Sequence, residues 1–177
     1  MNVNLVAPIL LTRYAIPHMR KQGGGLIINI TSGVLHSVRT EPPGGGKTGL
    51  LYPLTKTGMD ALTYGLAPEL KEENIPIVSM TPGRTLIERP TGGKADYFGT
   101  NLATRHTVHV PAVAVVYLAT CAHPMAFTGQ RIDAPSFVRQ QGLMKPEDIT
   151  TPFKEGEIYD PYAEPFWKRL VAAGRKR

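Results

Sequence analysis

Residues 23–33 read GGGLIINITSG, a glycine turn followed by a short apolar strand and by a hydroxyl side chain, Ser32, at its carboxyl end. Residues 75–83 read IPIVSMTPG, a second strand of the same kind that Pro82-Gly83 closes. Short runs rich in β-branched residues and bounded by glycine or proline are typical of strands. Because active sites of open parallel α/β sheets lie at the carboxyl ends of strands, we expect Ser32 and Pro82-Gly83 to border one crevice.

Between these strands, residues 52–56 read YPLTK. On a helix, Tyr52 and Lys56 lie one turn apart on the same face. A lysine ammonium near a phenol favours the phenolate and lowers a pKa that is ordinarily about 10. Tyr52 then becomes a usable proton donor and acceptor near neutral pH. Chance alone gives this spacing in roughly one such chain in three, so the interpretation depends on the two flanking strands.

Over residues 2–135 the chain resembles the short-chain dehydrogenase/reductase family. The matching stretches are NLVAP (4–8), PHM (17–19), GG (24–25) with INITS (28–32), YPLTK (52–56), PG (82–83) and FTGQ (127–130). Their order and approximate spacing together make the assignment specific. The resemblance implies an oxidoreductase that transfers hydride between NAD or NADP and an alcohol or ketone of small size.

The resemblance also implies the fold, an α/β structure with a truncated Rossmann-like, doubly wound parallel sheet of about three strands and crossover helices. We expect helices at 2–22, 51–73 and 110–121, and strands at 25–31, 75–81 and 129–134. Residues 33–50 form a loop and residues 83–109 a substrate-covering segment. Residues 1–135 form the catalytic half of an NAD(P)-binding domain, and residues 136–177 an irregular C-terminal extension.

By resemblance, four residues share the catalytic work. Tyr52 is the acid/base, and Lys56 lowers its pKa and binds the nicotinamide ribose. Ser32 orients the substrate oxygen, and Asn4 completes a proton relay through a water beside Lys56. The cofactor-binding set is Tyr52, Lys56, Pro82, Gly83 and Thr85. Structural alternatives remain open, because Ser32 also suits a turn cap, Asn4 a helix start, and Tyr52 with Lys56 a surface pair.

Two features depart from the family pattern. Nineteen residues separate Ser32 from Tyr52, where about a dozen are usual, and the excess lies at residues 41–48. This stretch, EPPGGGKT, ends like a phosphate-binding loop, but Glu41 stands where that motif requires its first glycine. We therefore read it as an exposed loop at the rim of the site. In addition, Ile87 occupies the place of a threonine that often contacts the cofactor amide.

The glycine-rich turn that seats a dinucleotide pyrophosphate on a helix N-terminus does not occur here. By resemblance, residue 1 already belongs to the helix after the fourth strand. We expect a catalytic-half fragment with weak cofactor binding and an unpaired edge at strand 25–31. The residues that separate NAD from NADP lie in the missing half, and nothing in the sequence identifies the substrate.

Two other functions fit the same residues. The chain could be a non-catalytic oligomerisation partner of a full-length relative, or form a homo-oligomer, through helices 2–22 and 51–73. An epimerase or dehydratase of the extended branch shares the Tyr/Lys pair, but the chain after Pro82 is short for its substrate domain.

The composition of the chain limits the classes of partner that we expect it to bind. The net charge is +6, yet residues 1–167 hold 15 Lys and Arg against 14 Asp and Glu, so the excess lies in the last ten residues. Such a basic end is more typical of a solvated tail than of a nucleic-acid surface. The single cysteine, Cys121, suits a reducing cytoplasm. No run of about 20 apolar residues predicts a membrane span, and His106 and His109 lack partners at metal-ligand spacing.

Overall fold

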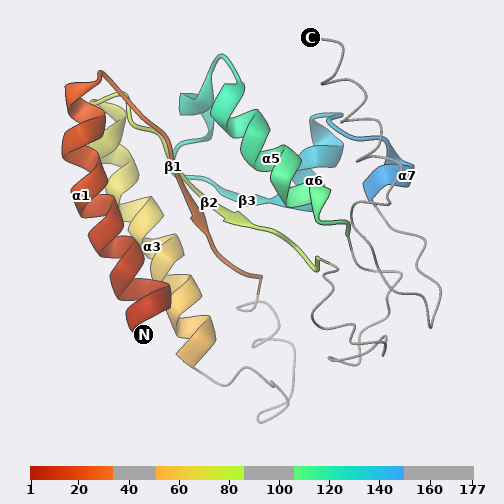
Figure 1. Cartoon of the computed structure of the whole chain (residues 1–177), viewed down its shortest axis with the longest axis horizontal. Coiled ribbons are helices and arrows are strands. Elements are labelled where there is room, and N and C mark those ends of the chain that lie inside the picture. The colour runs from red at the N-terminus through yellow and green to blue at the C-terminus, as the bar shows by residue number, and fades with distance from the viewer. Residues whose placement is uncertain (34–50, 86–105, 150–177) are drawn as a thin grey trace. The chain divides into compact units, whose positions relative to one another are not determined.

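The computed structural model describes residues 1–33, 51–85 and 106–149. Three parallel strands form one sheet in the order β1-β2-β3 (Figure 1): β1 (Ile27–Ile30), β2 (Ile77–Thr81) and β3 (Arg131–Asp133). The register places Asn29 beside Ser79, and Ser79 beside Arg131. Parallel neighbours joined through helices confirm the predicted α/β class.

Helices connect and flank the strands. They are η1 (Asn2–Val6), α1 (Ala7–Lys21), α3 (Leu51–Lys71), α5 (His109–Thr120), η3 (Pro124–Phe127), α6 (Ala134–Gln140) and α7 (Pro146–Ile149). The helices predicted at 2–22, 51–73 and 110–121 and the three predicted strands are confirmed, with strands shorter than expected. The predicted loop at 33–50 and most of the segment at 83–109 lie outside the described residues.

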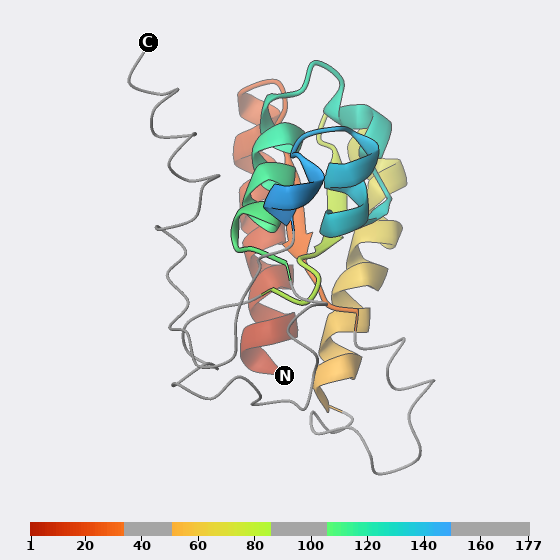
Figure 2. The same cartoon turned by 90° about the vertical axis from the view of Figure 1, so that its right-hand side faces the viewer.

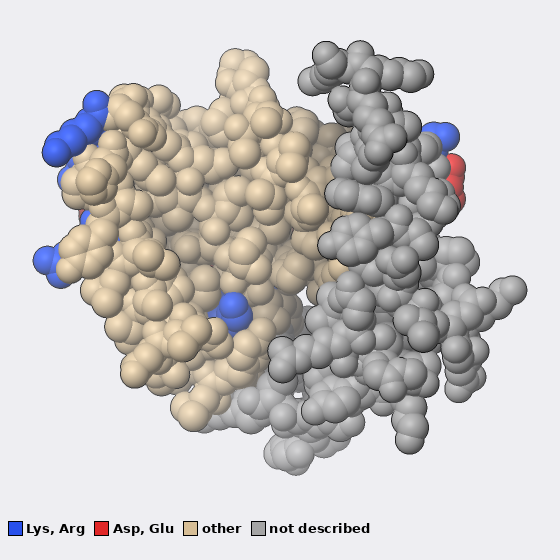
Figure 3. Space-filling model, in the orientation of Figure 1, with Lys and Arg blue, Asp and Glu red and all other residues tan. Residues whose placement is uncertain are grey.

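The first helix is continuous through both of its prolines. Its opening turn, η1, is a π-helix, and Pro8 stands in the first turn of α1, where a missing N–H costs little. Pro17 lies inside α1. Basic side chains occupy the last turn, at the negative end of the helix dipole, and Figure 3 shows Lys and Arg gathered where α1 ends.

One of these, Arg20, binds Glu73 in the turn before β2 through two nitrogens, with Nη2 2.6 Å from Oε1. The hydrogen bond from Arg20 lowers the pKa of Glu73. Because the pair is on the surface, its contribution to stability is small.

The core lies between the sheet and the two long helices. A buried cluster of Ala67, Leu70, Ile75 and Ile77 is covered by Ile16, Met19, Ile27 and Leu66. These residues come from α1, α3, β1, β2 and, for Ile75, the turn before β2, and Figures 1 and 2 show α1 and α3 running alongside each other on one side of the sheet. Every residue of β2 is buried, as its central place requires. The packing therefore fixes α3, the helix that carries Tyr52 and Lys56, against the strands.

The chain divides into two compact units. One comprises Met1–Thr81 and Val115–Asp133, and the other Pro82–Ala114 and Ala134–Arg177. The sheet, α1 and α3 belong to the first. The assignment of 1–135 as a catalytic half stays a prediction, since these units follow contacts and not that boundary.

The expectation of an irregular structure from residue 136 is wrong for residues 136–149. Residues 136–140 form the end of α6 and residues 146–149 the whole of α7, both visible in blue in Figure 2. Ala134, Phe137 and Val138 are buried along one side of α6, and Thr107 N–H donates to the carbonyl of Ile149 at 3.2 Å. Residues 150–177 lie outside the described part.

None of the helices within 1–33, 51–85 and 106–149 combines the length and apolar character needed to cross a lipid bilayer.

Candidate functional site

The predicted pair lies on α3 as its spacing requires. Tyr52 and Lys56 are one turn apart and both partly buried, and Lys56 Nζ lies 5.9 Å from the centroid of the Tyr52 ring. That distance is within the range of a cation–π contact. The ammonium and the phenol therefore share one small region of the helix surface.

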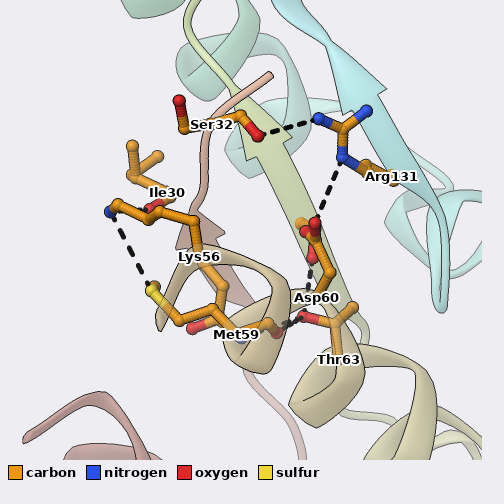
Figure 4. Close-up of polar contacts among 9 residues, drawn as sticks. Ile30, Ser32, Lys56, Met59, Asp60, Thr63 and Arg131 are labelled. Carbon is orange, nitrogen blue, oxygen red and sulfur yellow. Dashed lines mark hydrogen bonds and ion pairs between the residues drawn. The ribbon is translucent and has the colours of Figure 1, made fainter. Parts of the chain in front are cut away.

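Lys56 brings this region to the carboxyl end of β1. Its Nζ donates a hydrogen bond to the carbonyl oxygen of Ile30 at 2.9 Å and lies 4.0 Å from Met59 Sδ (Figure 4). Ile30 is the last residue of β1, two positions before Ser32. Burial lowers the pKa of Lys56, and the negative charge of Asp60 partly offsets that effect. Less solvated than a surface lysine, Lys56 gives up a proton more readily.

Ser32 follows directly on β1. The last ladder bond runs from Thr31 N–H to the carbonyl of Met80, at 2.8 Å. Beyond it, the Ser32 carbonyl accepts a bond from Arg131 Nη2 at 3.0 Å. Figure 4 shows this carbonyl directed at Arg131, while the Ser32 hydroxyl points away from it. The structure thus brings Ser32, Lys56 and Tyr52 to one end of β1, as predicted from the two strands and the helix; their catalytic roles stay predictions.

A row of buried polar residues holds α3 on the sheet. Asn29 and Ser79 are register neighbours on β1 and β2, and both donate to Thr63 Oγ1, from Nδ2 at 3.0 Å and from Oγ at 2.9 Å. Thr63 in turn donates to the carbonyl of Met59 at 3.2 Å. Buried polar groups that all find partners fix a helix in one position on a sheet.

The same row continues to β3 through a charged pair. Arg131 is the register neighbour of Ser79, and its Nε lies 3.3 Å from Oδ2 of Asp60, one turn after Lys56 on α3. Sequence reasoning did not single out any member of this row. The available signal was a polar residue inside each of the apolar strands IINI and IVSM.

Asn4 lies in the π-turn that opens the first helix. This turn packs against α3 at Gly58, where an added Cβ would come within 2.8 Å of Leu5 Cδ1. Single π-turns are frequent at functional sites. Asn4 stands in the opening turn of the helix, whose N-cap is Met1, so the helix-start role considered as its structural alternative stays open. Its part in a proton relay stays a prediction.

Pro82, Gly83 and Thr85 follow β2 and belong to the second compact unit. Gly83 has φ +77°, and an added Cβ there would lie 2.6 Å from Pro135 Cγ, so only glycine fits. Thr85 Oγ1 donates to the Pro82 carbonyl at 3.3 Å, and Thr85 bridges to His106. The segment is therefore a tight turn. Its contacts with the cofactor stay a prediction. Ile87 lies outside the described residues.

A groove of about 360 Å³ runs beside β1. It is lined by Pro8, Leu11, Thr12, Ala15 and Met19 of α1, by residues 26–30, and by Met59. Its lining includes Ile30, the residue whose carbonyl Lys56 binds. Within the described residues β1 pairs with β2 alone, and residues 26–30 line the groove; the unpaired edge expected for strand 25–31 stays a prediction.

Metal ligands do not cluster in the described ranges: no group of three His, Cys, Asp or Glu side chains is close enough to hold an ion.

Comparison with known proteins identifies the family. The sequence profile of the short chain dehydrogenases matches residues 1–91, half of the chain. An uncharacterized oxidoreductase of Thermotoga maritima is 40% identical over 81 residues, which cover 46% of this chain and 29% of the relative.

Solved structures are similar to a larger part of this chain than the sequence profile is. Acetoin dehydrogenase YohF from Salmonella typhimurium is 27% identical, with a TM-score of 0.54, over 74% of this chain and 50% of that one. A gluconate 5-dehydrogenase from Burkholderia cenocepacia, solved with NADP and tartrate, is 26% identical, with a TM-score of 0.59, over 75% and 52%. The chain thus spans about half the length of these structures, and its matches to curated relatives span about 30% of theirs.

Proposed function

Because the chain belongs to the short-chain dehydrogenase family, we propose that it carries the acid/base half of an NAD(P)-dependent oxidoreductase acting on a small alcohol or ketone. One observation carries the proposal. Lys56 Nζ lies 5.9 Å from the Tyr52 ring and binds the last carbonyl of β1, beside Ser32. A phenol, an ammonium and a hydroxyl at the end of a parallel strand are the groups that proton transfer to a carbonyl oxygen needs.

Each residue then has a distinct task. Tyr52 gives a proton to the substrate oxygen during reduction, or takes it during oxidation. Lys56 places its positive charge beside the Tyr52 ring. Ser32 donates a hydrogen bond that orients the substrate oxygen, and Asn4 connects Lys56 to solvent through a water. When bound, NAD or NADP supplies or accepts the hydride.

The described residues fit the nicotinamide end of such a cofactor. An ammonium has three N–H donors, and Lys56 directs one at the Ile30 carbonyl and a weaker one at Met59 Sδ, which leaves a third for a ribose hydroxyl. Pro82, Gly83 and Thr85 form the turn that would border the nicotinamide. Within the described ranges, no strand leads through a glycine-rich turn into a helix, the usual pyrophosphate seat. We propose that the 177 residues alone bind NAD(P) weakly, in a reducing, cytoplasmic setting that suits the free thiol of Cys121.

Substitution of Tyr52 tests the chemical role. We expect Tyr52→Phe to abolish turnover of acetoin or gluconate with either cofactor, because the phenyl ring cannot exchange a proton. Cofactor binding should stay within about threefold, since the hydroxyl carries the chemistry and little of the binding energy. The matched control is Tyr64→Phe, on an exposed site of the same helix.

The measurements are absorbance of reduced nicotinamide for turnover and nicotinamide fluorescence for binding. Turnover by Tyr52→Phe at the rate of Tyr64→Phe would remove Tyr52 from the mechanism. Micromolar binding of NADH or NADPH by the 177-residue chain would contradict the proposal of weak binding.

A second function is favoured by exposed apolar residues on the two long helices. Val3, Val6, Ile9, Leu10, Leu11 and Tyr14 are exposed on η1 and α1, and Leu51, Leu54 and Tyr64 on α3. Figure 3 shows few charged atoms over α1 away from its end. A non-catalytic partner that pairs through these helices, with itself or with a full-length relative, would bury this surface. Sedimentation as a monomer, both alone and mixed with a relative, would exclude it.

A further inference from the structure

The carbonyl of Ser32, just after β1, accepts a hydrogen bond from a side chain on β3, two strands away. Hydrogen bonding between β1 and β2 ends at Thr31, whose N–H reaches Met80 at 2.8 Å. The next carbonyl, that of Ser32, accepts instead from Nη2 of Arg131 on β3, at 3.0 Å. Arg131 therefore spans the carboxyl end of the sheet, past β2, to reach the turn that carries the Ser32 hydroxyl (Figure 4).

Arg131 is itself anchored on the catalytic helix. Its Nε lies 3.3 Å from Oδ2 of Asp60, whose side chain is only 12% exposed. Asp60 is one turn after Lys56, and its other oxygen, Oδ1, has no hydrogen-bond partner among the described residues. A buried carboxylate with one oxygen that accepts no hydrogen bond depends on nearby cations, here Arg131 in direct contact and Lys56 through its charge, and solvent screens the Arg131 pair less than a surface pair.

We propose that Asp60 and Arg131 form a positioning clamp that fixes the Ser32 turn of β1 relative to the face of α3 that carries Tyr52 and Lys56. This inference rests on the proposed function, in which Ser32 and Tyr52 bind the same substrate oxygen. A guanidinium suits the role because its planar fork serves two acceptors at a fixed angle, which a lysine ammonium does not. Neither residue touches the substrate; both act through Ser32.

If the ion pair had a purely structural role, its removal would have different effects. If Asp60 and Arg131 only stabilised the fold, removing them would lower the unfolding free energy and leave the folded Ser32 turn unchanged. If they form the clamp, the turn loosens while the sheet stays rigid. The order parameters of backbone amides separate these outcomes, because they report the folded state alone.

The first experiment is ¹⁵N NMR relaxation on the 177-residue chain and its variants. We expect Arg131→Gln to lower the order parameter of the Gly33 amide from about 0.85 to below about 0.6, while that of Val78 in β2 stays near about 0.85. Arg131→Lys should loosen Gly33 as well, because an ammonium cannot hold both acceptors. Arg13→Gln, which removes an exposed guanidinium from α1, is the control. An unchanged Gly33 in a folded Arg131→Gln or Arg131→Lys chain would overturn the clamp.

A measurement on the unsubstituted chain covers the case in which the variants do not fold. A guanidinium held by two acceptors rotates slowly and gives separate Nη resonances, whereas a solvated one gives an averaged signal. We expect separate resonances for Arg131 and averaged ones for Arg13. An averaged signal for Arg131 would equally overturn the proposal.

Kinetics add a readout that separates this inference from the proposed function. In any preparation that turns over acetoin with NAD or NADP, Arg131→Gln should lower kcat/KM by about 10- to 100-fold, as misplaced substrate groups do. The dissociation constant of the cofactor should not change. If the unsubstituted chain shows no turnover, the proposed function fails, and the NMR results still decide whether the clamp exists.

Discussion

Lys56 is the residue on which most contacts of the site converge. Its Nζ binds the Ile30 carbonyl, lies beside the Tyr52 ring and is within the field of Asp60. Burial lowers its pKa more than Asp60 raises it. The protein thus keeps a partly desolvated ammonium at the end of β1, beside the ring of Tyr52.

The lowered pKa of Lys56 predicts a dependence of stability on pH. Unfolding returns the ammonium to water and to a pKa of about 10.4. At a pH between the pKa of Lys56 in the folded chain and its pKa in the unfolded chain, the unfolded chain binds more protons. The contribution of Lys56 to the unfolding free energy therefore rises with pH over this alkaline range. Below the folded pKa both states are charged and this contribution is constant.

Lys56→Met removes this dependence. We expect the stability of the unsubstituted chain relative to Lys56→Met to increase with alkaline pH up to about pH 10.4, measured by urea unfolding at each pH. Lys71→Met, an exposed lysine at the end of the same helix, supplies the baseline for losing one surface charge. Parallel curves for the unsubstituted chain and Lys56→Met would contradict the desolvation of Lys56.

Among the elements, the turn between α1 and β1 shows how the glycines determine the path of the chain. Gly23 N–H bonds to the Arg20 carbonyl at 3.1 Å and Gly24 N–H to that of Met19 at 2.9 Å, the two bonds of a Schellman cap. Gly23 has φ +83° and Gly24 φ +150°. An added Cβ at Gly24 would lie 2.8 Å from the carbonyl oxygen of Asn74. The turn therefore ends α1 and directs the chain into β1.

This geometry predicts opposite effects at two glycines. Gly24→Ala should lower the unfolding free energy by about 1–3 kcal/mol, because it forces a side chain into a strained φ and against backbone. Gly65→Ala, on the exposed side of α3 with open space around it, should raise the unfolding free energy by up to about 1 kcal/mol through helix propensity. Thermal or urea unfolding measures both, and equal stability of the two variants would contradict the turn.

At the scale of the molecule, two surfaces of the first compact unit concern association. Among the described residues β1 pairs with β2 alone, β1 lines the groove beside α1, and Leu11, which also lines that groove, is 70% exposed. Strand edges and apolar patches of this kind promote association. The exposed face of α1 is therefore the surface that we expect to be buried when the chain pairs with itself or with a relative.

A charge placed on that surface tests the expectation. Leu11→Glu should weaken self-association at least about tenfold, since burying an unpaired carboxylate costs more than 1.4 kcal/mol. Val116→Glu, at a similarly exposed apolar position on α5, should leave it unchanged. Sedimentation velocity over a range of concentrations measures both. Equal weakening by the two variants would show that general charge, and not the face of α1, is responsible.

The sequence predicted the elements well and their ends less well. Strand β1 begins at Ile27 and not at residue 25, because the preceding glycines belong to the cap of α1. Helix α6 was missed because seven residues are too few for a clear period, although Ala134, Phe137 and Val138 show helical spacing. The Tyr52, Lys56 and Ser32 cluster was predictable from spacing within a helix and from its flanking strands. Asp60 and Arg131 were not, since they are 71 positions apart, on α3 and β3, and meet only because the helix packs on the sheet.

Local sequence determined which segments become strands and helices, which side chains lie one helical turn apart, and that parallel strands end near one another. These properties follow from backbone geometry and from the period of apolar residues, which neighbouring positions define. Only the tertiary structure decided that Lys56 binds the carbonyl of Ile30, that Thr63 joins Asn29 to Ser79, and that Arg131 reaches the Ser32 turn. Those contacts depend on strand order and on the depth at which α3 packs, and such long-range distances are set by the packing of the whole core.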